Sequence, residues 1–243
     1  EIMQFFFKLI EISCPRCYCQ LGLYQLADDN KQKPSKQRPY KFTAKPRARP
    51  TAAKPELKMT HRDDIVSYCN QRLGIDKYTD YCPNGLQVEG KKIIKKIITG
   101  VSACLDLLIA AEKEDADMII VHHGYFWKNE KRTITGIQKK RIQTLIQHNI
   151  NLLGYHLPLD GHQEIGNNAM LAKVLNWTVL RSLPSSCGSN IGMLGKLSTA
   201  VAADALKDIM QKKLSHAPLM VSNNPKKEIR HIAWCSGAAA DDI

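Results

Sequence analysis

Residues 118–124 read Met-Ile-Ile-Val-His-His-Gly, so that an apolar run ends directly in two histidines and a glycine. Residues 153–160 read Leu-Gly-Tyr-His-Leu-Pro-Leu-Asp and repeat this arrangement further along the chain. Apolar runs of this kind form strands that are buried on both faces of a sheet. In α/β folds the loops at the carboxyl ends of such strands hold ligands. The two segments therefore predict an α/β fold with a ligand site at one edge of its sheet.

Residues 138–149, between these two segments, have the apolar spacing of a helix. Strand, helix and strand then make one βαβ unit. A right-handed crossover sets the two strands parallel and brings their carboxyl ends to the same edge. The sequence thus predicts that four side chains lie in one neighbourhood, namely His122, His123, His156 and Asp160.

These side chains have the chemistry of a metal site, because imidazole and carboxylate groups bind zinc, iron and manganese. Neighbouring strand residues point to opposite faces, so His122 and His123 share one site only if the strand ends and turns at Gly124. Otherwise each histidine serves a different ion of a two-metal pair. Asp160 has two oxygens and is suited to bridge two ions that share an activated water.

The same residues also allow a plainer interpretation, in which strand-end histidines only satisfy backbone hydrogen bonds. For His156 the sequence leaves three roles open, as a metal ligand, as a proton carrier or as a partner that supports a ligand.

Other segments predict the remaining elements. Thr60 is expected to cap a helix that ends at Gly74. The further predictions are strands at 93–101, 193–197, 219–222 and 229–235, helices at 103–114 and 199–214, a helix ending at Asn176 and a loop at 181–191. Ser236 and Gly237 read as a turn into another helix, which suggests an unfinished βα unit at the end of the chain.

Basic residues are concentrated in the first part of the chain. Residues 1–58 hold 12 Lys and Arg against 5 Asp and Glu, which is over half of the net charge of +12. The Pro, Lys and Arg content of residues 30–58 leaves too little apolar surface to offset chain entropy. We predict a disordered or non-native basic extension at 1–58 and a folded domain at 59–243. Cys14 and Cys17 have the spacing of half a zinc site, with unstructured thiols as the alternative.

Three segments, at 81–90, 121–128 and 155–160, resemble the signatures of the NIF-three-like family, whose members are often called GTP cyclohydrolase I type 2 homologs. The resemblance runs from Met59 to Ile243. It implies an α/β protein of two similar lobes with mixed and parallel sheets. It also implies a homo-hexamer with a dinuclear metal centre of two divalent ions, which would be zinc, iron or manganese.

In the family pattern the two consecutive histidines and the aspartate are metal ligands, which here are His122, His123 and Asp160. The family also has a His and a Glu four residues apart near its C-terminus. This pair has no counterpart after Asp160, so the resemblance implies that the pattern is truncated and that the chain as given binds metal poorly.

The resemblance implies a metal-dependent hydrolase that acts on a nucleotide-like or phosphoester small molecule, with His156 as the candidate catalytic residue. The alternative is a non-catalytic metal-binding regulatory protein that acts through protein partners. Nucleic acid is not an expected partner, because residues 30–58 offer only Tyr40 and Phe42 for stacking. No apolar run is long enough to span a bilayer, and a chain of this length needs no disulfides, so we expect a cytoplasmic protein without membrane contact.

Overall fold

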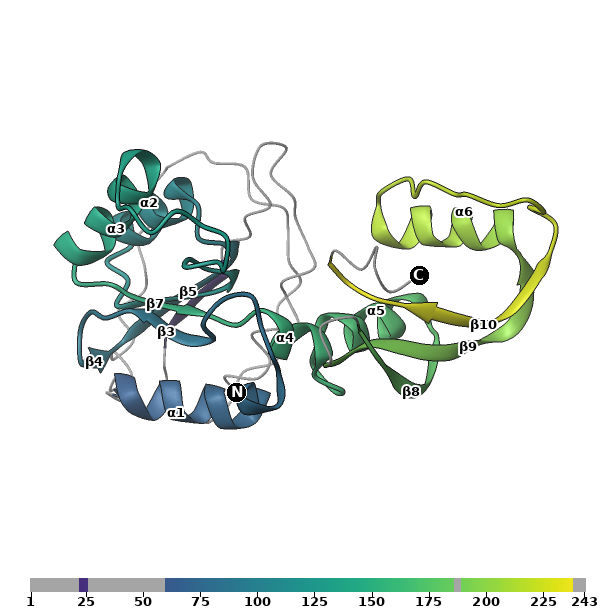
Figure 1. The fold of residues 1–243 in the computed structure, drawn as a ribbon, viewed down its shortest axis with the longest axis horizontal. Helices are drawn as coiled ribbons and strands as arrows, with labels where there is room; N and C mark the ends of the chain where they lie inside the picture. Colours follow the sequence, from purple (N-terminus) through teal and green to yellow (C-terminus); the bar gives the residue numbers. More distant parts are fainter. Residues whose placement is uncertain (1–21, 26–59, 186–188, 238–243) are drawn as a thin grey trace, which may run out of the picture.

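The computed structural model describes residues 22–25, 60–185 and 189–237. They form two lobes; helix α4 (Leu157–Gly161) lies between the two sheets, and α5 (Asn167–Leu175) packs against the sheet of the second lobe (Figure 1). The first lobe contains a mixed five-stranded sheet and the second an antiparallel three-stranded sheet. The predicted α/β class with mixed and parallel strands is therefore confirmed.

The five-stranded sheet has the order β1-β5-β6-β7-β3, and its three central strands are parallel. Its strands are β1 (Gly22–Gln25), β3 (Gly85–Val88), β5 (Lys96–Ser102), β6 (Met118–His123) and β7 (Asn151–Gly154). Helix α1 (Arg62–Leu73) lies on one side of the sheet, while α2 (Leu105–Lys113) and α3 (Gly136–Gln147) lie on the other (Figure 1). A small sheet of β2 (Thr60–His61) and β4 (Ile93–Ile94) and a short 3₁₀ helix, η2 (Ile75–Lys77), complete the lobe.

The central strands are buried on both faces, as the apolar runs predict. Ile119 of β6 packs in a cluster with Leu108 of α2, on the upper face in Figure 1. Ile120, the next residue of β6, packs with Ile65 of α1 in a separate cluster on the opposite face. Successive residues of β6 thus belong to two cores on opposite faces of the sheet. This packing fixes the position of the strand and of the histidines at its end.

The predicted βαβ unit is present as β6, α3 and β7, with Val121 paired to Gly154 across parallel strands. Helix α1 ends at Gly74 in the left-handed conformation (φ 61°), as predicted. The predicted cap at Thr60 is wrong, because Thr60 pairs with Ile94 in the small sheet. The N-cap is instead His61, whose side chain accepts a hydrogen bond from the backbone N–H of Asp63.

The second lobe has the strand order β10-β9-β8, from β8 (Thr178–Pro184), β9 (Asn190–Ala202) and β10 (Glu228–Trp234), with helix α6 (Ala203–Leu214) beside it. The loop predicted at 181–191 is too long, because β8 continues to Pro184 and β9 begins at Asn190. The mostly exposed side chains of β8 carry no apolar alternation that could mark a strand. The strand predicted at 219–222 is wrong, because these residues pair with no strand of the described chain.

Only part of the predicted N-terminal extension lies among the described residues. Gly22–Gln25 forms β1, which pairs antiparallel with β5 at the edge of the sheet. The rest of 1–58, with Cys14 and Cys17, lies outside the described residues, as does the helix predicted after Gly237. The extension therefore stays a prediction.

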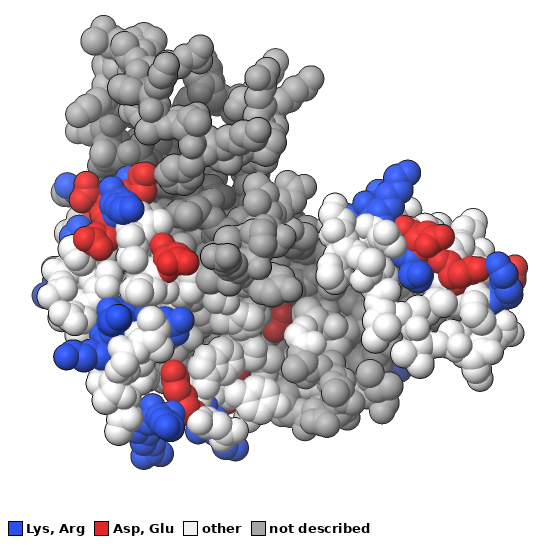
Figure 2. Space-filling model, turned by 90° about the horizontal axis from the view of Figure 1, so that it is seen from above, with Lys and Arg blue, Asp and Glu red and all other residues white. Residues whose placement is uncertain are grey.

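Basic and acidic side chains are interspersed on the described part of the face in Figure 2, over both lobes. That face is therefore not a continuous basic surface of the kind that tracks nucleic acid. Among the described residues, no helix combines the length and the apolar character needed to cross a bilayer.

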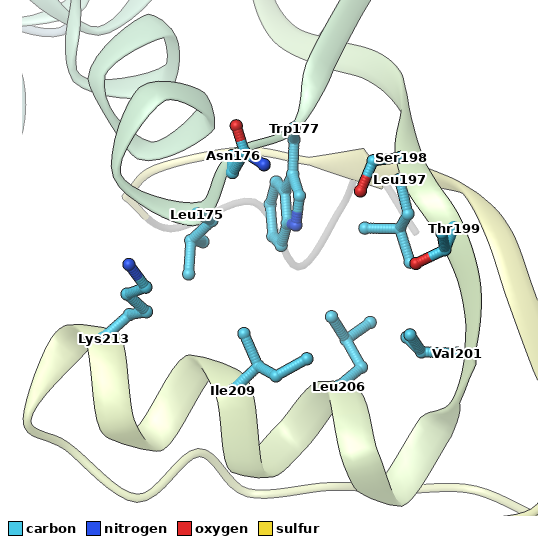
Figure 3. Close-up of a pocket in the computed structure, with 10 residues that line it drawn as sticks. All are labelled: Leu175, Asn176, Trp177, Leu197, Ser198, Thr199, Val201, Leu206, Ile209 and Lys213. Carbon is cyan, nitrogen blue, oxygen red and sulfur yellow. The ribbon is translucent and has the colours of Figure 1, made fainter.

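A pocket of about 270 Å³ lies between α6 and the sheet of the second lobe (Figure 3). Leu206 and Ile209 point into it from α6, and Trp177 and Leu197 face them from the other side (Figure 3). None of the residues of α6 is buried, so this helix covers its sheet less closely than the helices of the first lobe do. The pocket contains none of the clustered histidines.

The amides of α6 should exchange with solvent deuterium faster than those of α2. Helix α2 buries Leu107, Leu108 and Ala111, whereas α6 buries no side chain, and local opening is easiest where few apolar contacts are lost. Hydrogen exchange followed by mass spectrometry on peptides from 203–214 and 105–113 would measure the difference. Equal protection of the two helices would contradict this expectation.

Candidate metal centre

The ends of β6 and β7 bring the predicted residues together. His122 and His123 end β6, and His156 follows β7 and precedes α4. The ring centroid of His122 lies 4.4 Å from that of His123 and 5.1 Å from that of His156, and the His123 and His156 centroids are 5.8 Å apart. One ring nitrogen from each of the three lies within 4.8 Å of the others. The predicted neighbourhood of imidazoles is therefore found.

The adjacent histidines share this site because β6 ends at His123 and the chain turns at Gly124. A Cβ atom on Gly124 would lie 2.1 Å from Oε1 of Gln87, and one on Gly154 would lie 2.7 Å from Nε2 of the same side chain. Oε1 of Gln87 accepts a hydrogen bond from the backbone N–H of Tyr125 (2.7 Å), and its Nε2 donates to the carbonyl of Pro83 (2.8 Å). The absence of side chains at Gly124 and Gly154 thus leaves room for the Gln87 amide, which stabilises the turn after β6.

Gly124→Ala should lower the free energy of unfolding by about 1–3 kcal/mol, the usual cost of leaving buried polar groups without partners. The new methyl group would displace the Gln87 amide, so the N–H of Tyr125 would lose its acceptor. Urea denaturation of the variant and the parent measures the change. Gly192→Ala is the matched control, because a Cβ there meets other atoms at 3.4 Å or more and should change stability by less than about 0.5 kcal/mol.

Each of the three imidazoles is anchored through its Nδ1 atom. Nδ1 of His122 lies 3.0 Å from the carbonyl oxygen of Tyr155, and Nδ1 of His123 lies 3.0 Å from Oγ of Ser102. Nδ1 of His156 lies 2.7 Å from Oδ1 of Asp80. Such outer contacts fix ring orientation and leave Nε2 as the remaining nitrogen of each ring. The backbone contact foreseen for a strand-end histidine is present at His122, but it engages only one of the two ring nitrogens.

Asp160 is buried on α4 and offers one oxygen to the cluster. Its Oδ1 accepts hydrogen bonds from Nδ2 of Asn167 (2.8 Å) and from Oγ of Ser236 (2.7 Å). Its Oδ2 lies 3.5 Å from Nε2 of His122. The described arrangement therefore presents Oδ2 rather than both oxygens, which does not support the predicted bridging of two ions through both carboxylate oxygens.

Ser236 belongs to the second lobe, just after β10, and the same lobe contacts Asn168 of α5. Oδ1 of Asn168 accepts from the backbone N–H of Ser236 (2.7 Å), and its carbonyl accepts from Nε1 of Trp234 (3.0 Å). The position of the Asp160 carboxylate thus depends on contacts from both lobes.

Burial shifts the protonation of the histidines toward the neutral form. It lowers the pKa of His122, although the carboxylate of Asp160 opposes the shift. Burial, with a further effect of His122, lowers the pKa of His123 to about 4. Neutral imidazole is the form that binds a metal ion, so at neutral pH neither ring must lose a proton first.

The carboxylate of Asp80 is a further member of the site that sequence reasoning missed. Burial alone would raise its pKa, but hydrogen bonds from His156, Asn84 and the backbone of Leu157 outweigh burial and lower the pKa. Asn84 in turn accepts from the backbone N–H of His156 (2.8 Å). Residues 80–85 read Asp-Tyr-Cys-Pro-Asn-Gly, a sequence typical of a turn, which could have signalled polar contacts but not their target beyond β7.

Comparisons with known proteins identify the family of this chain. Residues 60–243 match the model of the family Duf34/NIF3 (NGG1p interacting factor 3). The GTP cyclohydrolase 1 type 2 homolog of Yersinia pestis is 45% identical over 174 residues, covering 72% of this chain and 68% of that protein. The protein of the same name from Pasteurella multocida is 48% identical over 180 residues, covering 74% and 71%.

Solved structures show the same likeness. The protein ybgI, described as of unknown function, has a TM-score of 0.68 and 39% identity, covering 74% of this chain and 70% of its own. TTHA1606 from Thermus thermophilus has a TM-score of 0.59 and 33% identity, covering 70% and 69%. The resemblance seen in the three sequence segments is confirmed, and the chain belongs to the Duf34/NIF3 (NGG1p interacting factor 3) family.

Proposed function

We propose that this protein is a metal-dependent hydrolase that acts on a nucleotide-like or phosphoester substrate. The observation that carries the proposal is the convergence of three imidazoles, each anchored through Nδ1, beside Oδ2 of Asp160. The relatives named GTP cyclohydrolase 1 type 2 homolog support the same class of substrate.

The donor set fits a divalent metal ion. Neutral imidazole nitrogens and a carboxylate oxygen suit zinc, iron or manganese. We propose His122, His123 and Asp160 as ligands. Together with His156 they would supply four donors, which is the number that one tetrahedral ion needs. We therefore propose that these residues hold one ion, in place of the poor metal binding that the sequence predicted from three donors alone. The proposal of a second ion, and of assembly as a homo-hexamer, rests on the family resemblance.

A bound divalent ion supplies Lewis acidity and makes a water a better nucleophile at neutral pH. The ion would lie at the carboxyl ends of β6 and β7, held by His122, His123 and Asp160. The ring of Trp127 packs edge-on against His156, with centroids 4.8 Å apart, and limits the access of bulk water to that ring. His156 faces the same centre and would act as a ligand or as a proton carrier.

The segment that follows β6 has the chemistry to bind such a substrate. Phe126 is 41% exposed and adopts a left-handed backbone (φ 66°), which is uncommon for a bulky residue. Oε2 of Glu130 fixes this turn by accepting the N–H groups of Phe126 (2.9 Å) and Trp127 (3.2 Å). An exposed aromatic ring can stack on a base. Exposed cations follow it and suit phosphate, namely Lys128, Lys131 and Arg132.

The second candidate is a non-catalytic metal-binding protein that acts through protein partners. Leu219 and Val221 favour it, because each is 93% exposed on the second lobe. Contact with a protein partner would remove this apolar surface from water. In either role we propose a reducing, cytoplasmic setting. Cys69 and Cys82 are buried free thiols, and burial raises their pKa to about 11 and about 12.

A direct test separates the two candidates. The protein is loaded with zinc, manganese or iron and assayed against nucleoside triphosphates, cyclic nucleotides and aryl phosphodiesters. Turnover that is lost in His122→Ala would support the hydrolase. Bound metal without turnover of any of these compounds would favour the second candidate, and failure to bind any of the three metals would contradict both.

A further inference from the structure

We propose that Asp80 fixes the tautomer of His156 and thereby makes Nε2 of His156 a third imidazole ligand of the metal centre. The inference rests on the proposed metal site, but its first measurement is made on the metal-free protein. Asp80 acts through His156 and is a positioning residue.

Asp80 is held by five hydrogen-bond donors, three at Oδ1 and two at Oδ2. Oδ1 accepts from Nδ1 of His156 (2.7 Å), from the backbone N–H of Tyr81 (2.6 Å) and, in a longer contact, from Sγ of Cys82 (4.0 Å). Oδ2 accepts from the backbone N–H of Leu157 (2.9 Å) and from Nδ2 of Asn84 (2.8 Å). The side chain of Asp80 is only 4% exposed. These contacts occupy the carboxylate, so Asp80 itself is not placed to bind a cation, although Cys82 and His156 lie close to it.

The contacts decide which nitrogen of His156 carries the proton. An ionised carboxylate only accepts hydrogen bonds, so Nδ1 of His156 has to donate. The neutral ring then has its lone pair on Nε2. With Nδ1 held by Asp80, Nε2 is the nitrogen left for the cluster formed with His122 and His123. The same arrangement of a carboxylate behind a metal-binding imidazole fixes ring orientation and raises ligand basicity.

Asp80→Asn should reverse the tautomer. The amide has one accepting oxygen and one NH₂ group, and it meets fixed donors on both sides. On the Oδ2 side, the N–H of Leu157 and the amide of Asn84 both donate. On the Oδ1 side, the Tyr81 N–H is fixed, but His156 can change roles by moving its proton to Nε2. We expect the NH₂ group to face Nδ1 of His156, so that Nε2 carries hydrogen and cannot bind metal.

The first measurement is a long-range ¹H–¹⁵N correlation spectrum of the histidine rings in the metal-free protein. We expect the Nδ1–H form of His156 in the parent and the Nε2–H form in Asp80→Asn. A purely structural role of Asp80 would not reverse the tautomer.

The second measurement is zinc affinity, by competition with a chromophoric chelator. Asp80→Asn should bind zinc at least 10-fold more weakly, within the roughly 10–100-fold range typical of groups that support a ligand. Asp117→Asn is the matched control, because Asp117 is also buried and accepts from Lys91 and two backbone N–H groups, but contacts none of the histidines. It should leave zinc affinity unchanged.

His156→Asn serves as the second variant, because it removes the ligand and leaves Asp80 intact. It should weaken zinc binding at least as much as Asp80→Asn, and the double variant should be no weaker than His156→Asn alone, since the two residues act as one unit.

An Nε2–H ring in the metal-free parent would overturn the inference, as would zinc affinity within twofold of the parent in Asp80→Asn or His156→Asn. If the parent and Asp117→Asn both fail to bind zinc, the proposed metal centre and the ligand role fall together. The tautomers of the metal-free proteins would then still show whether Asp80 positions His156.

Discussion

Asp160→Asn should leave the protein folded and remove most of its capacity to bind divalent metal. Asn167 and Ser236 both donate to Oδ1, so the amide oxygen of the variant should take that position and keep both hydrogen bonds. The NH₂ group would then replace Oδ2, 3.5 Å from Nε2 of His122. A donor in this place offers no electron pair to a cation and binds the lone pair of His122. We expect a loss of zinc affinity of about 10-fold or more, comparable to or larger than the loss of a supporting group.

Elemental analysis after dialysis against a fixed zinc concentration would measure this loss. Glu164→Gln is the matched control, because Glu164 lies four residues further on, is exposed and pairs with Arg72 instead of a histidine. It should keep the metal content of the parent. Equal metal content in Asp160→Asn and the parent would remove Asp160 from the proposed ligand set.

Metal-free protein should lose stability steeply as the pH falls from about 6.5 toward 4. Burial lowers the pKa of His122, and it lowers the pKa of His123 to about 4, whereas an unfolded histidine titrates near 6.5. Between these values the unfolded chain binds more protons, so acid favours unfolding. The stabilisation is complete above the unfolded pKa and is lost as the pH falls through the folded one. Each ring contributes up to about 1.4 kcal/mol per pH unit in this window.

Urea denaturation at pH 7.5, 6.0 and 5.0 would measure the slope of stability against pH. His123→Gln should reduce this slope by nearly the contribution of one titrating histidine, because glutamine does not titrate. Gln147→Ala, at an exposed position with no titratable group, should leave the slope as it is in the parent. A slope in His123→Gln equal to that of the parent would show that the His123 ring is not held neutral by the fold.

The sequence predicted the first lobe well because its signals are local. The apolar runs before His122 and before His156, with a helical pattern between them, define one βαβ unit, and crossover handedness then brings the imidazoles together. The second lobe was predicted less well. Strand β8 is exposed along most of its length, so its pairing with β9 leaves no apolar alternation to read.

The residues that orient the proposed ligands were beyond prediction for a different reason. Asp80, Ser102 and Ser236 act on His156, His123 and Asp160, and each contact joins positions far apart in the chain. Nothing in the residue type or local spacing of a serine or an aspartate shows which distant side chain it will meet. Only the packed tertiary structure defines these pairs.

The hydrogen bond from Ser236 to Asp160 determines when, during synthesis of the chain, the site can be completed. The three imidazoles precede α4 and can gather as soon as the chain through β7 has left the ribosome. The carboxylate of Asp160 acquires its second hydrogen bond only when Ser236, 76 residues later, has been synthesised and the second lobe has docked. During synthesis, domains fold as units from the N-terminus. An N-terminal lobe that emerges alone would therefore hold three histidines with an incompletely oriented acid, and metal binding at the proposed centre would be delayed until the second lobe arrives.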